Sequence, residues 1–411
     1  MSETDQNAPT VGDLGEWSSY TSSPQESLDA FDTARAKCPV AFSHGHDGFF
    51  IPLTYDTVLE VDRTHETYSV APQLFRPILD RPPILAVEMD PPEHGIWRAV
   101  FSKIVNGRTP KRMEGFVRHE TARRIENFVE RGHCDIVQEL SATVPALAIC
   151  HLMGIDDQEV ALTIQRTSSA MFAAQGDPVE YARETQIFKE VAMAEFHDRL
   201  VSPRDDILTE LTTMEVDGRT LTEVDHFSLL NAILGAGHHS TTSGTTSAIY
   251  EVFSDPALRD RLINEPDKIS AVIEEALRLH PPFFGFFRRT TAETTLGGTA
   301  IPAQADVYMN FGAANRDPAA FGCPHKVDID RPSLRKHLTF GAGIHTCLGS
   351  PLARMEIRVM LEELLARVPD MRVDGDVAYV FDAGEYQHIP SLPVSFSARP
   401  PREVVAEAIT D

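Results

Sequence analysis

The segment FGAGIHTCLG, residues Phe340–Gly349, places one of only five cysteines among glycines. The sequence that follows it, SPLARMEIRVMLEELLARV, has the apolar spacing of an amphipathic helix with Pro351 at its start. The positive end of such a helix and the N–H groups of a glycine-rich turn favour the thiolate form of Cys347. A thiolate held in this way is suited to binding a soft metal.

Three interpretations of Cys347 compete. It can be a buried structural cysteine, a nucleophile with His345 as its base, or an axial thiolate ligand of haem iron. Residues two apart before a helix are poorly placed to act as nucleophile and base. The pattern formed by Phe340, Gly343, His345, Cys347 and Gly349 resembles F-x-x-G-x-[HR]-x-C-x-G, the haem-binding signature of the cytochrome P-450 superfamily.

Other blocks resemble the same family, in the family's order, over roughly residues 50–398. EEALRLHPP supplies Glu275 and Arg278, which match an ExxR motif that forms a buried structural network beneath the haem. A surface ion pair is the alternative interpretation of two residues three apart on a helix. In AANRDPAAFGCPHKVDIDRP, which also fits, Lys326 stands where arginine is commoner.

The resemblance also implies which residues surround the cofactor, haem b (iron protoporphyrin IX). FFRRTTAETTLGGTAIPAQ offers Arg288, and MDPPEHGIWRAVFSK offers His94 and Arg98 on one helix face. These side chains, with His345, would reach the haem propionates. Donors around two buried carboxylates make physical sense, because unpaired buried charge is costly.

The apolar pattern indicates a mainly α fold with small β-sheets. Residues 110–275 are mostly helical, and the β-rich parts are 39–53, 282–310 and 370–398. We expect one long helix of roughly 30 residues between a cap at Thr222 and a stop at Ser254. Residues 1–22 are interpreted as a flexible tail and 23–411 as a single catalytic domain. The resemblance implies the cytochrome P-450 fold, a triangular prism crossed by a long central I-helix.

Composition excludes several classes of protein. The net charge of −24 argues against nucleic acid and anionic membranes as partners. Five widely spaced cysteines without a CxxC pair argue against a disulfide framework or a structural zinc site. The sequence has no apolar run long enough for a membrane span and no secretory signal pattern, so we expect a cytoplasmic protein, and a monomer.

The long helix departs from the family pattern A-G-x-[DE]-T at GAGHHSTTSG. The resemblance makes Ala236 and Gly237 a groove for O2, but His239 occupies the acid position and Ser240 the alcohol position. Histidine can also relay protons and serine keeps a hydroxyl, so we expect the same chemistry through an altered relay with Thr241 in reserve. Packing or solvent exposure is the alternative interpretation of both histidines, and we favour it for the neighbouring His238.

Apolar side chains predict a substrate pocket for a compact hydrophobic molecule, terpenoid-like or a small aromatic. At least one of the phenylalanines in HPPFFGFF should line it, with walls from the segment VAPQLFRPIL. The predicted pocket residues are Leu74, Phe75, Ile78, Phe283, Phe284, Phe286 and Phe287, with Met171 and Phe172 as weaker candidates. Arg76 or Arg81 could bind a substrate carboxylate, although surface exposure is the favoured interpretation of both.

The sequence shows neither a flavin domain nor a cysteine cluster, so the electrons would come from a separate ferredoxin-type partner. Two basic clusters are candidates for its docking surface, and a solvated basic patch is the equal alternative. They are Lys103, Arg108, Lys111 and Arg112, and Arg331, Arg335 and Lys336.

The resemblance therefore implies a soluble, bacterial class I haem-thiolate monooxygenase, in which Cys347 ligates the iron and one oxygen atom of O2 enters the substrate. Two alternatives remain. One is a haem-thiolate sensor or binding protein without turnover, and the other is a peroxygenase driven directly by peroxide.

Overall fold

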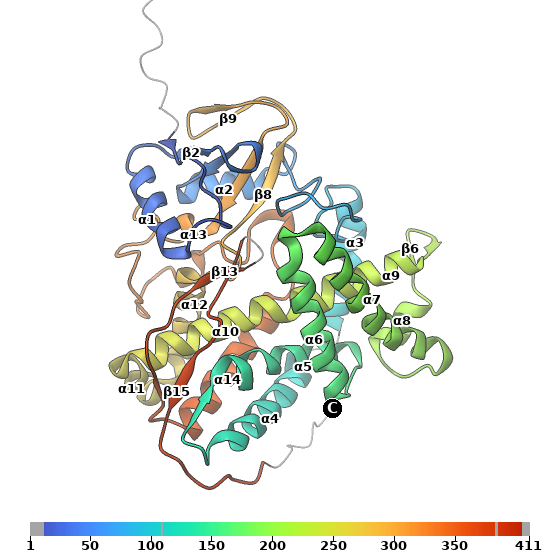
Figure 1. The fold of residues 1–411 in the computed structure, drawn as a ribbon, viewed down its shortest axis with the longest axis vertical. Coiled ribbons are helices and arrows are strands. Elements are labelled where there is room, and N and C mark those ends of the chain that lie inside the picture. The colour runs from blue at the N-terminus through green and yellow to red at the C-terminus, as the bar shows by residue number, and fades with distance from the viewer. Residues whose placement is uncertain (1–11, 108–109, 383–384, 405–411) are drawn as a thin grey trace, which may run out of the picture.

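The structure is a computed structural model that describes residues 12–107, 110–382 and 385–404, without the side chains of 106–112. Helices dominate it, and the largest sheet lies at the top of the view, so the predicted fold class is confirmed (Figure 1). The α-helices are α1 (Pro24–Arg35), α2 (Tyr55–Arg63), α3 (Glu93–Gly107), α4 (Pro110–Phe128), α5 (Thr143–Met153), α6 (Gln158–Ala173), α7 (Pro178–Val201), α8 (Ile207–Thr212), α9 (Glu223–Leu230), α10 (Ala236–Ser254), α11 (Pro256–Asn264), α12 (Ile269–Leu279), α13 (Phe311–Ala314) and α14 (Ser350–Arg367).

Short 3₁₀ and π turns connect these helices. They are η1 (Gly45–Asp47), η2 (Val137–Ser141), η3 (Ala174–Gly176), η4 (Asn231–Gly235), η5 (Pro266–Lys268), η6 (Leu334–Lys336) and η7 (Gly343–His345).

The largest sheet has six strands in the order β1-β2-β3-β11-β8-β4, and the remaining strands form small sheets of two or three. The strands are β1 (Gly12–Asp13), β2 (Val40–Ser43), β3 (Phe49–Pro52), β4 (Tyr68–Ser69), β5 (His133–Asp135), β6 (Glu215–Val216), β7 (Arg219–Thr220), β8 (Gly285–Thr290), β9 (Thr294–Leu296), β10 (Thr299–Ile301), β11 (Asp306–Asn310), β12 (Arg372–Val373), β13 (Val380–Asp382), β14 (Tyr386–His388) and β15 (Pro393–Ser395).

The N-terminal segment differs from the expected flexible tail from residue 12 onward. Gly12 and Asp13 pair in parallel with β2, and the Trp17 side chain is buried. The Trp17 and Phe31 ring centroids are 4.8 Å apart, edge to face. Burying a large aromatic side chain gains roughly 1.5–3 kcal/mol, enough to hold a short segment in place. The following helix begins at Pro24, with a capping box between Ser23 and Glu26.

The predicted long helix is present as three consecutive helical segments from Glu223 to Ser254. Thr222 caps it, accepting a hydrogen bond from the N–H of Asp225. The sequence reasoning missed the π turn η4, which widens the helix directly before Ala236. Single π turns inside α-helices are frequent at functional sites. In Figure 1 this helix crosses the molecule between the sheet side and helices α4, α5 and α14.

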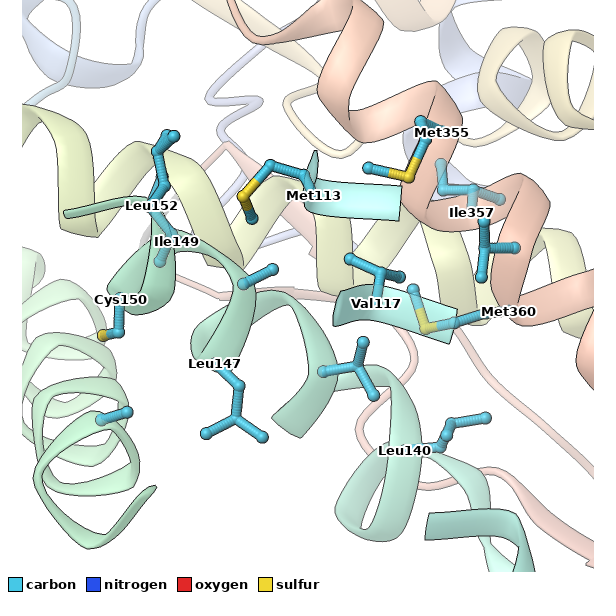
Figure 2. Packing of buried hydrophobic residues seen from close by; sticks show 14 of the residues in the cluster. Met113, Val117, Leu140, Leu147, Ile149, Cys150, Leu152, Met355, Ile357 and Met360 are labelled. Carbon is cyan, nitrogen blue, oxygen red and sulfur yellow. The ribbon is translucent and has the colours of Figure 1, made fainter. Parts of the chain in front are cut away.

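The main core lies where α4, α5 and α14 pack around α10. Figure 2 shows part of it: Met113 and Val117 of α4, Ile149 of α5 and Met360 of α14 point into one shared interior. Gly237 allows the close approach of α10 to α5, because an added Cβ would lie only 2.5 Å from an Ile149 side-chain atom. Gly237 therefore serves helix packing, and the expected groove for O2 at Ala236 and Gly237 stays a prediction.

None of the helices in the described part of the chain has both the length and the apolarity needed to cross a membrane.

Candidate active site

The loop of Cys347 joins η7 to the N-terminus of α14. The Cys347 N–H donates to the Phe340 carbonyl at 2.8 Å, which closes the loop. The N–H groups of Gly349 and Ser350 point at the sulfur, as the position before a helix start predicts. Burial raises the pKa of the thiol, while these two N–H groups and the guanidinium groups of Arg98 and Arg354 favour the thiolate. Cys347 itself is exposed, so the surrounding protein reduces the solvation of the thiolate while the sulfur stays accessible to a ligand.

Two of the glycines in the loop are required by backbone geometry. Gly341 and Gly343 have φ of +68° and +69°, which side chains disfavour. An added Cβ on Gly343 would lie 3.0 Å from the carbonyl oxygen of Asp62, at the end of α2. These two glycines therefore allow the loop to pack closely against the end of α2.

Four nitrogen-bearing side chains gather beside this loop, and we call them the nitrogen cluster: His94 and Arg98 from α3, Arg288 from β8, and His345. The rings of His94 and His345 lie 4.4 Å apart. Both Nε2 atoms are buried and, within the described structure, have no hydrogen-bond partner. Arg98 donates to the carbonyl of Thr346.

The nitrogen cluster has an excess of donors over acceptors. Burial lowers the pKa of His345 to about 3, assisted by Arg288, His94 and Arg98. Burial also lowers the pKa of His94 and of Arg288. A carboxylate that contacts the nitrogen cluster is that of Asp62, whose Oδ1 lies 3.7 Å from Arg288 Nη2. Such a cluster is suited to a ligand with more than one carboxylate.

Glu275 and Arg278 form a fully buried, bidentate ion pair at 2.7 and 2.9 Å. Arg278 also donates to the carbonyls of Asn315 and Pro324, and to that of Lys326. Arg331 is also buried, and its Nε donates to Glu275 at 3.1 Å. Arg331 therefore belongs to this network, which corrects its expected place in a docking surface.

A second buried carboxylate, that of Glu274, holds α14, the helix that follows the cysteine, in place. It accepts from Arg354 of α14 at 2.6 and 2.9 Å and pairs with His337 at 2.9 Å. The guanidinium of Arg354 in turn lies 4.3 Å from the centre of the Phe340 ring. Phe340 is thereby held between the ion pair and the loop.

One stripe of α10 is less buried than the rest of that helix. Ala236 is exposed and Ser240, one turn later, is partly exposed. The Ser240 hydroxyl donates to the Ala236 carbonyl at 3.2 Å, and the Thr241 hydroxyl donates to Gly237 at 3.3 Å. Ala236 and Ser240 thus define an open face at the start of α10, and the Thr241 hydroxyl lies buried beside it.

His238 and His239 are both buried, with ring centroids 3.9 Å apart. His239 stacks on Phe172 at 5.1 Å, and its Nε2 lies 3.3 Å from the Ser168 hydroxyl of α6. Burial lowers the pKa of His239 well below its ordinary value, with His238 and His388 adding to the effect. Burial lowers the pKa of His238 to about 4. Both rings are therefore neutral near pH 7.

Next to His239 lies an aromatic cluster formed by Phe75, Phe172, Phe283, Phe286 and Tyr386. Its ring centroids are 5.0 to 6.1 Å apart. Leu74 packs beside it, whereas Met171 lies in the main core.

Three predicted pocket residues lie elsewhere. Phe287 belongs to another core with Trp17 and Tyr308, because neighbouring residues of β8 face opposite sides and Phe286 takes the side of the aromatic cluster. Phe284, which precedes β8, lies in that other core as well. Ile78 is 47% exposed. The Gln73 side chain bonds both the N–H and the carbonyl of Leu79, and this closed turn leaves Ile78 on its outer side.

Of the two arginines proposed for a substrate carboxylate, Arg76 is buried and Arg81 is partly buried, and both are already paired. Arg76 Nε donates to Asp306 at 2.7 Å, and Arg81 contacts Glu88 at 2.6 and 2.8 Å. Surface exposure, the favoured interpretation of both arginines, is therefore wrong. Arg76 pairs with a carboxylate that is distant in sequence, and Arg81 pairs with one in the same loop.

Of the predicted basic clusters, Lys103, Arg335 and Lys336 are exposed. The Lys336 ammonium lies 4.6 Å from the centre of the Tyr55 ring. Arg108 and the side chains of Lys111 and Arg112 lie outside the described residues.

Comparison with known proteins identifies this arrangement. The sequence model described as Cytochrome P450 matches residues 164–368. The chain is 30% identical over 402 residues to a steroid C26-monooxygenase of Mycobacterium tuberculosis, covering 96% of this chain and 99% of that protein. It is 32% identical over 356 residues to the erythromycin C-12 hydroxylase of Saccharopolyspora erythraea, covering 85% and 89%.

Solved structures agree with these relatives. A crystal structure of CYP108D1 from Novosphingobium aromaticivorans has a TM-score of 0.81 at 26% identity, covering 92% of this chain and 97% of that one. The chain belongs to the cytochrome P450 family. It is accordingly a monooxygenase whose cofactor is haem, and it uses O2 and an external source of electrons.

The residues present fit a haem. The two orphaned imidazole nitrogens and two arginines of the nitrogen cluster match two propionates, and the Cys347 sulfur with its N–H donors matches an axial ligand. Sequence reasoning missed Asp62, Tyr386 and Glu274. Glu274 precedes Glu275 directly, so its charge on the same helix was the one available signal.

Proposed function

We propose that the Cys347 thiolate binds the haem iron and that His94, Arg98, Arg288 and His345 hold the propionates. The observation that carries this assignment is the convergence of four nitrogen-bearing side chains, two with unpartnered buried Nε2 atoms, on the loop that carries the sulfur. When bound, haem activates O2 so that one oxygen atom enters a C–H bond or a double bond of the substrate.

The protein supplies the setting for that chemistry. The N–H groups of Gly349 and Ser350 stabilise negative charge on the sulfur and tune how strongly it donates to the iron. Phe340, fixed by Arg354, shields the loop from water. The open stripe of α10 at Ala236 and Ser240 leaves room for O2 and substrate on the other side of the cofactor.

The proton path to the oxygen site is proposed to use the hydroxyls of Ser240 and Thr241 with His239 as the group behind them. His239 Nε2 faces the Ser168 hydroxyl and burial favours the neutral ring, so the ring would take up a proton on one nitrogen as it releases one from the other.

The proposed substrate is a compact hydrophobic molecule, terpenoid-like or a small aromatic. The aromatic cluster, with Leu74 and the neutral His239 at its edge, is an apolar wall with one polar point. The cited relatives act on a steroid and on erythromycin, so larger polycyclic substrates belong in the same screen.

The proposed electron donor is a ferredoxin-type protein, which would dock where Lys103, Arg335 and Lys336 are exposed. Positive side chains on a chain of net charge −24 would steer an acidic partner to this face. Charge reversal of Arg335 and Lys336 should slow reduction several-fold at low salt and less at high salt.

The test of the core assignment is the reduced carbon monoxide spectrum of the haem-loaded protein. The red-shifted Soret band of a thiolate-ligated haem is expected, and Cys347→Ser should abolish it. A haem-loaded wild-type protein without this band would contradict the assignment.

One observation favours a second candidate, a reaction driven by hydrogen peroxide. His239 is held by Phe172 and Ser168 and its pKa is far below that of a group charged at neutral pH, so the acid position holds a neutral base. Product formation with peroxide alone would support it. Substrate-dependent NADH consumption with surrogate redox partners would support the electron-driven reaction, and a sensor without turnover would show neither.

A further inference from the structure

We propose that Asp62 is a positioning residue that holds Arg288 and the loop of Cys347 in one fixed arrangement. The proposal rests on the roles assigned above to Arg288 and Cys347. Asp62 lies on α2, far in sequence from both, and its side chain is only 1% exposed. It belongs to none of the motifs that pointed to the haem site.

Each carboxylate oxygen of Asp62 faces a different part of the site. Oδ2 accepts a hydrogen bond from the N–H of Ala342, inside the cysteine loop. Oδ1 lies 3.7 Å from Nη2 of Arg288, which is 4% exposed. One rigid group on one helix therefore contacts both the loop that carries the sulfur and the arginine assigned to a propionate.

The backbone around Asp62 makes the same contact tight. An added Cβ on Gly341 would lie 3.4 Å from Asp62 Oδ2, and one on Gly343 would lie 3.0 Å from the Asp62 carbonyl oxygen. The end of α2 and the cysteine loop are thus in van der Waals contact, so a shift of one displaces the other.

Charge gives Asp62 a second effect. Burial raises its pKa to about 6, while Arg288, the Ala342 N–H and Arg63 favour the ionised form. A carboxylate here would share the charge of Arg288 with a bound propionate, and it adds negative potential beside the loop of Cys347. Removing that charge favours the reduced state, which carries one more electron, so the reduction potential should rise.

The experiment compares haem-loaded Asp62→Asn and Asp62→Ala with wild type. Glu60→Gln, an exposed residue of the same helix, is the control for charge. Asp62→Asn keeps an acceptor for Ala342, so it should retain the thiolate Soret band and show a more positive potential. Asp62→Ala should also lose haem about 10–100-fold faster to an excess of a haem-scavenging protein. Adding Asp62→Ala to Arg288→Met should speed haem loss by a smaller factor than Asp62→Ala does in wild type, because only the contact with the Cys347 loop is then left to lose.

The outcomes separate this inference from the assignment beneath it. If wild type lacks the thiolate band, the assignment of Cys347 fails first. If wild type has the band but Asp62→Asn matches Glu60→Gln in potential, the inference on Asp62 is wrong. Fully additive haem loss in the double variant also overturns it, because Asp62 would then not act through Arg288. If Asp62→Ala does not fold, the potential of Asp62→Asn still decides.

Discussion

The side of Cys347 and the side of α10 that carries His238 and His239 are built by different interactions. Around Cys347, buried ion pairs and backbone N–H donors fix the structure, with Glu275 and Arg278 at its centre. Around His239, neutral rings stack on one another and the polar contacts join neutral groups, as at Ser168. The first side is held by charge and the second by packing.

The difference teaches where each side tolerates change. A buried ion pair has strict geometry, and removal of one partner leaves a charge without compensation. Stacked aromatic rings accept substitutions of similar volume at a cost below about 1.5 kcal/mol. Departures from the family pattern should therefore collect on the side of α10, and GAGHHSTT is such a departure.

The largest expected effect breaks the charged side. Arg278→Ala leaves Glu275 buried with only Arg331 as a cationic partner, so the free energy of unfolding should fall by about 3–5 kcal/mol. Denaturant unfolding measures it. Arg358→Ala is the control, because its pairs with Glu114 and Glu362 are about 30% exposed and should contribute about 1 kcal/mol or less. Equal losses in the two variants would show that burial of the ion pair does not matter here.

Local spacing was enough to predict the cysteine loop, the cap at Thr222 and the helix after Pro351, because each depends on neighbours in sequence. Asp62 could not be predicted, since its partner Ala342 lies 280 positions away. Tyr386 was missed for the same reason. Its hydroxyl donates a hydrogen bond to the backbone carbonyl of His239, which lies 147 positions earlier in the sequence.

Burial also defeated several predictions about charged side chains. Composition gave no means to decide that Arg331 pairs with Glu275 or that Arg76 pairs with Asp306. Both partners come from other elements, so these arginines looked exposed in sequence. The pattern of the chain predicted the fold class and the thiolate loop, and the tertiary contacts decided which basic residues remain at the surface.

The next prediction concerns the side of α10 that is held by packing, and how its stability depends on pH. The pKa of His238 is about 4 in the folded protein, against an ordinary value of 6.5, because burial disfavours its charged form. The contribution of neutral His238 to the free energy of unfolding is therefore fully present above pH 6.5. It is lost as the pH drops toward 4, because the unfolded chain binds the proton first. The loss attributable to His238 is at most about 3 kcal/mol.

Denaturant unfolding at several pH values between 7.5 and 4.5 tests this dependence. His238→Asn should flatten the fall, and His44→Asn, at an exposed position, should leave it unchanged. An unchanged slope in His238→Asn would mean that the histidine binds its proton without unfolding.

The smallest effect concerns the glycines of the loop and separates backbone strain from crowding. Gly343 and Gly375 have φ of +69° and +71°, but an added Cβ meets the Asp62 carbonyl at 3.0 Å only at Gly343 and meets nothing within 4 Å at Gly375. Gly375→Ala should cost about 1–2 kcal/mol from strain alone. Gly343→Ala should cost more and also weaken the thiolate Soret band, because the loop must move away from α2. Gly349→Ala, at φ −77°, should cost little. If Gly343→Ala matched Gly375→Ala in stability and kept the full band, the loop would be seated by its ion pairs alone, and its contact with α2 would be incidental.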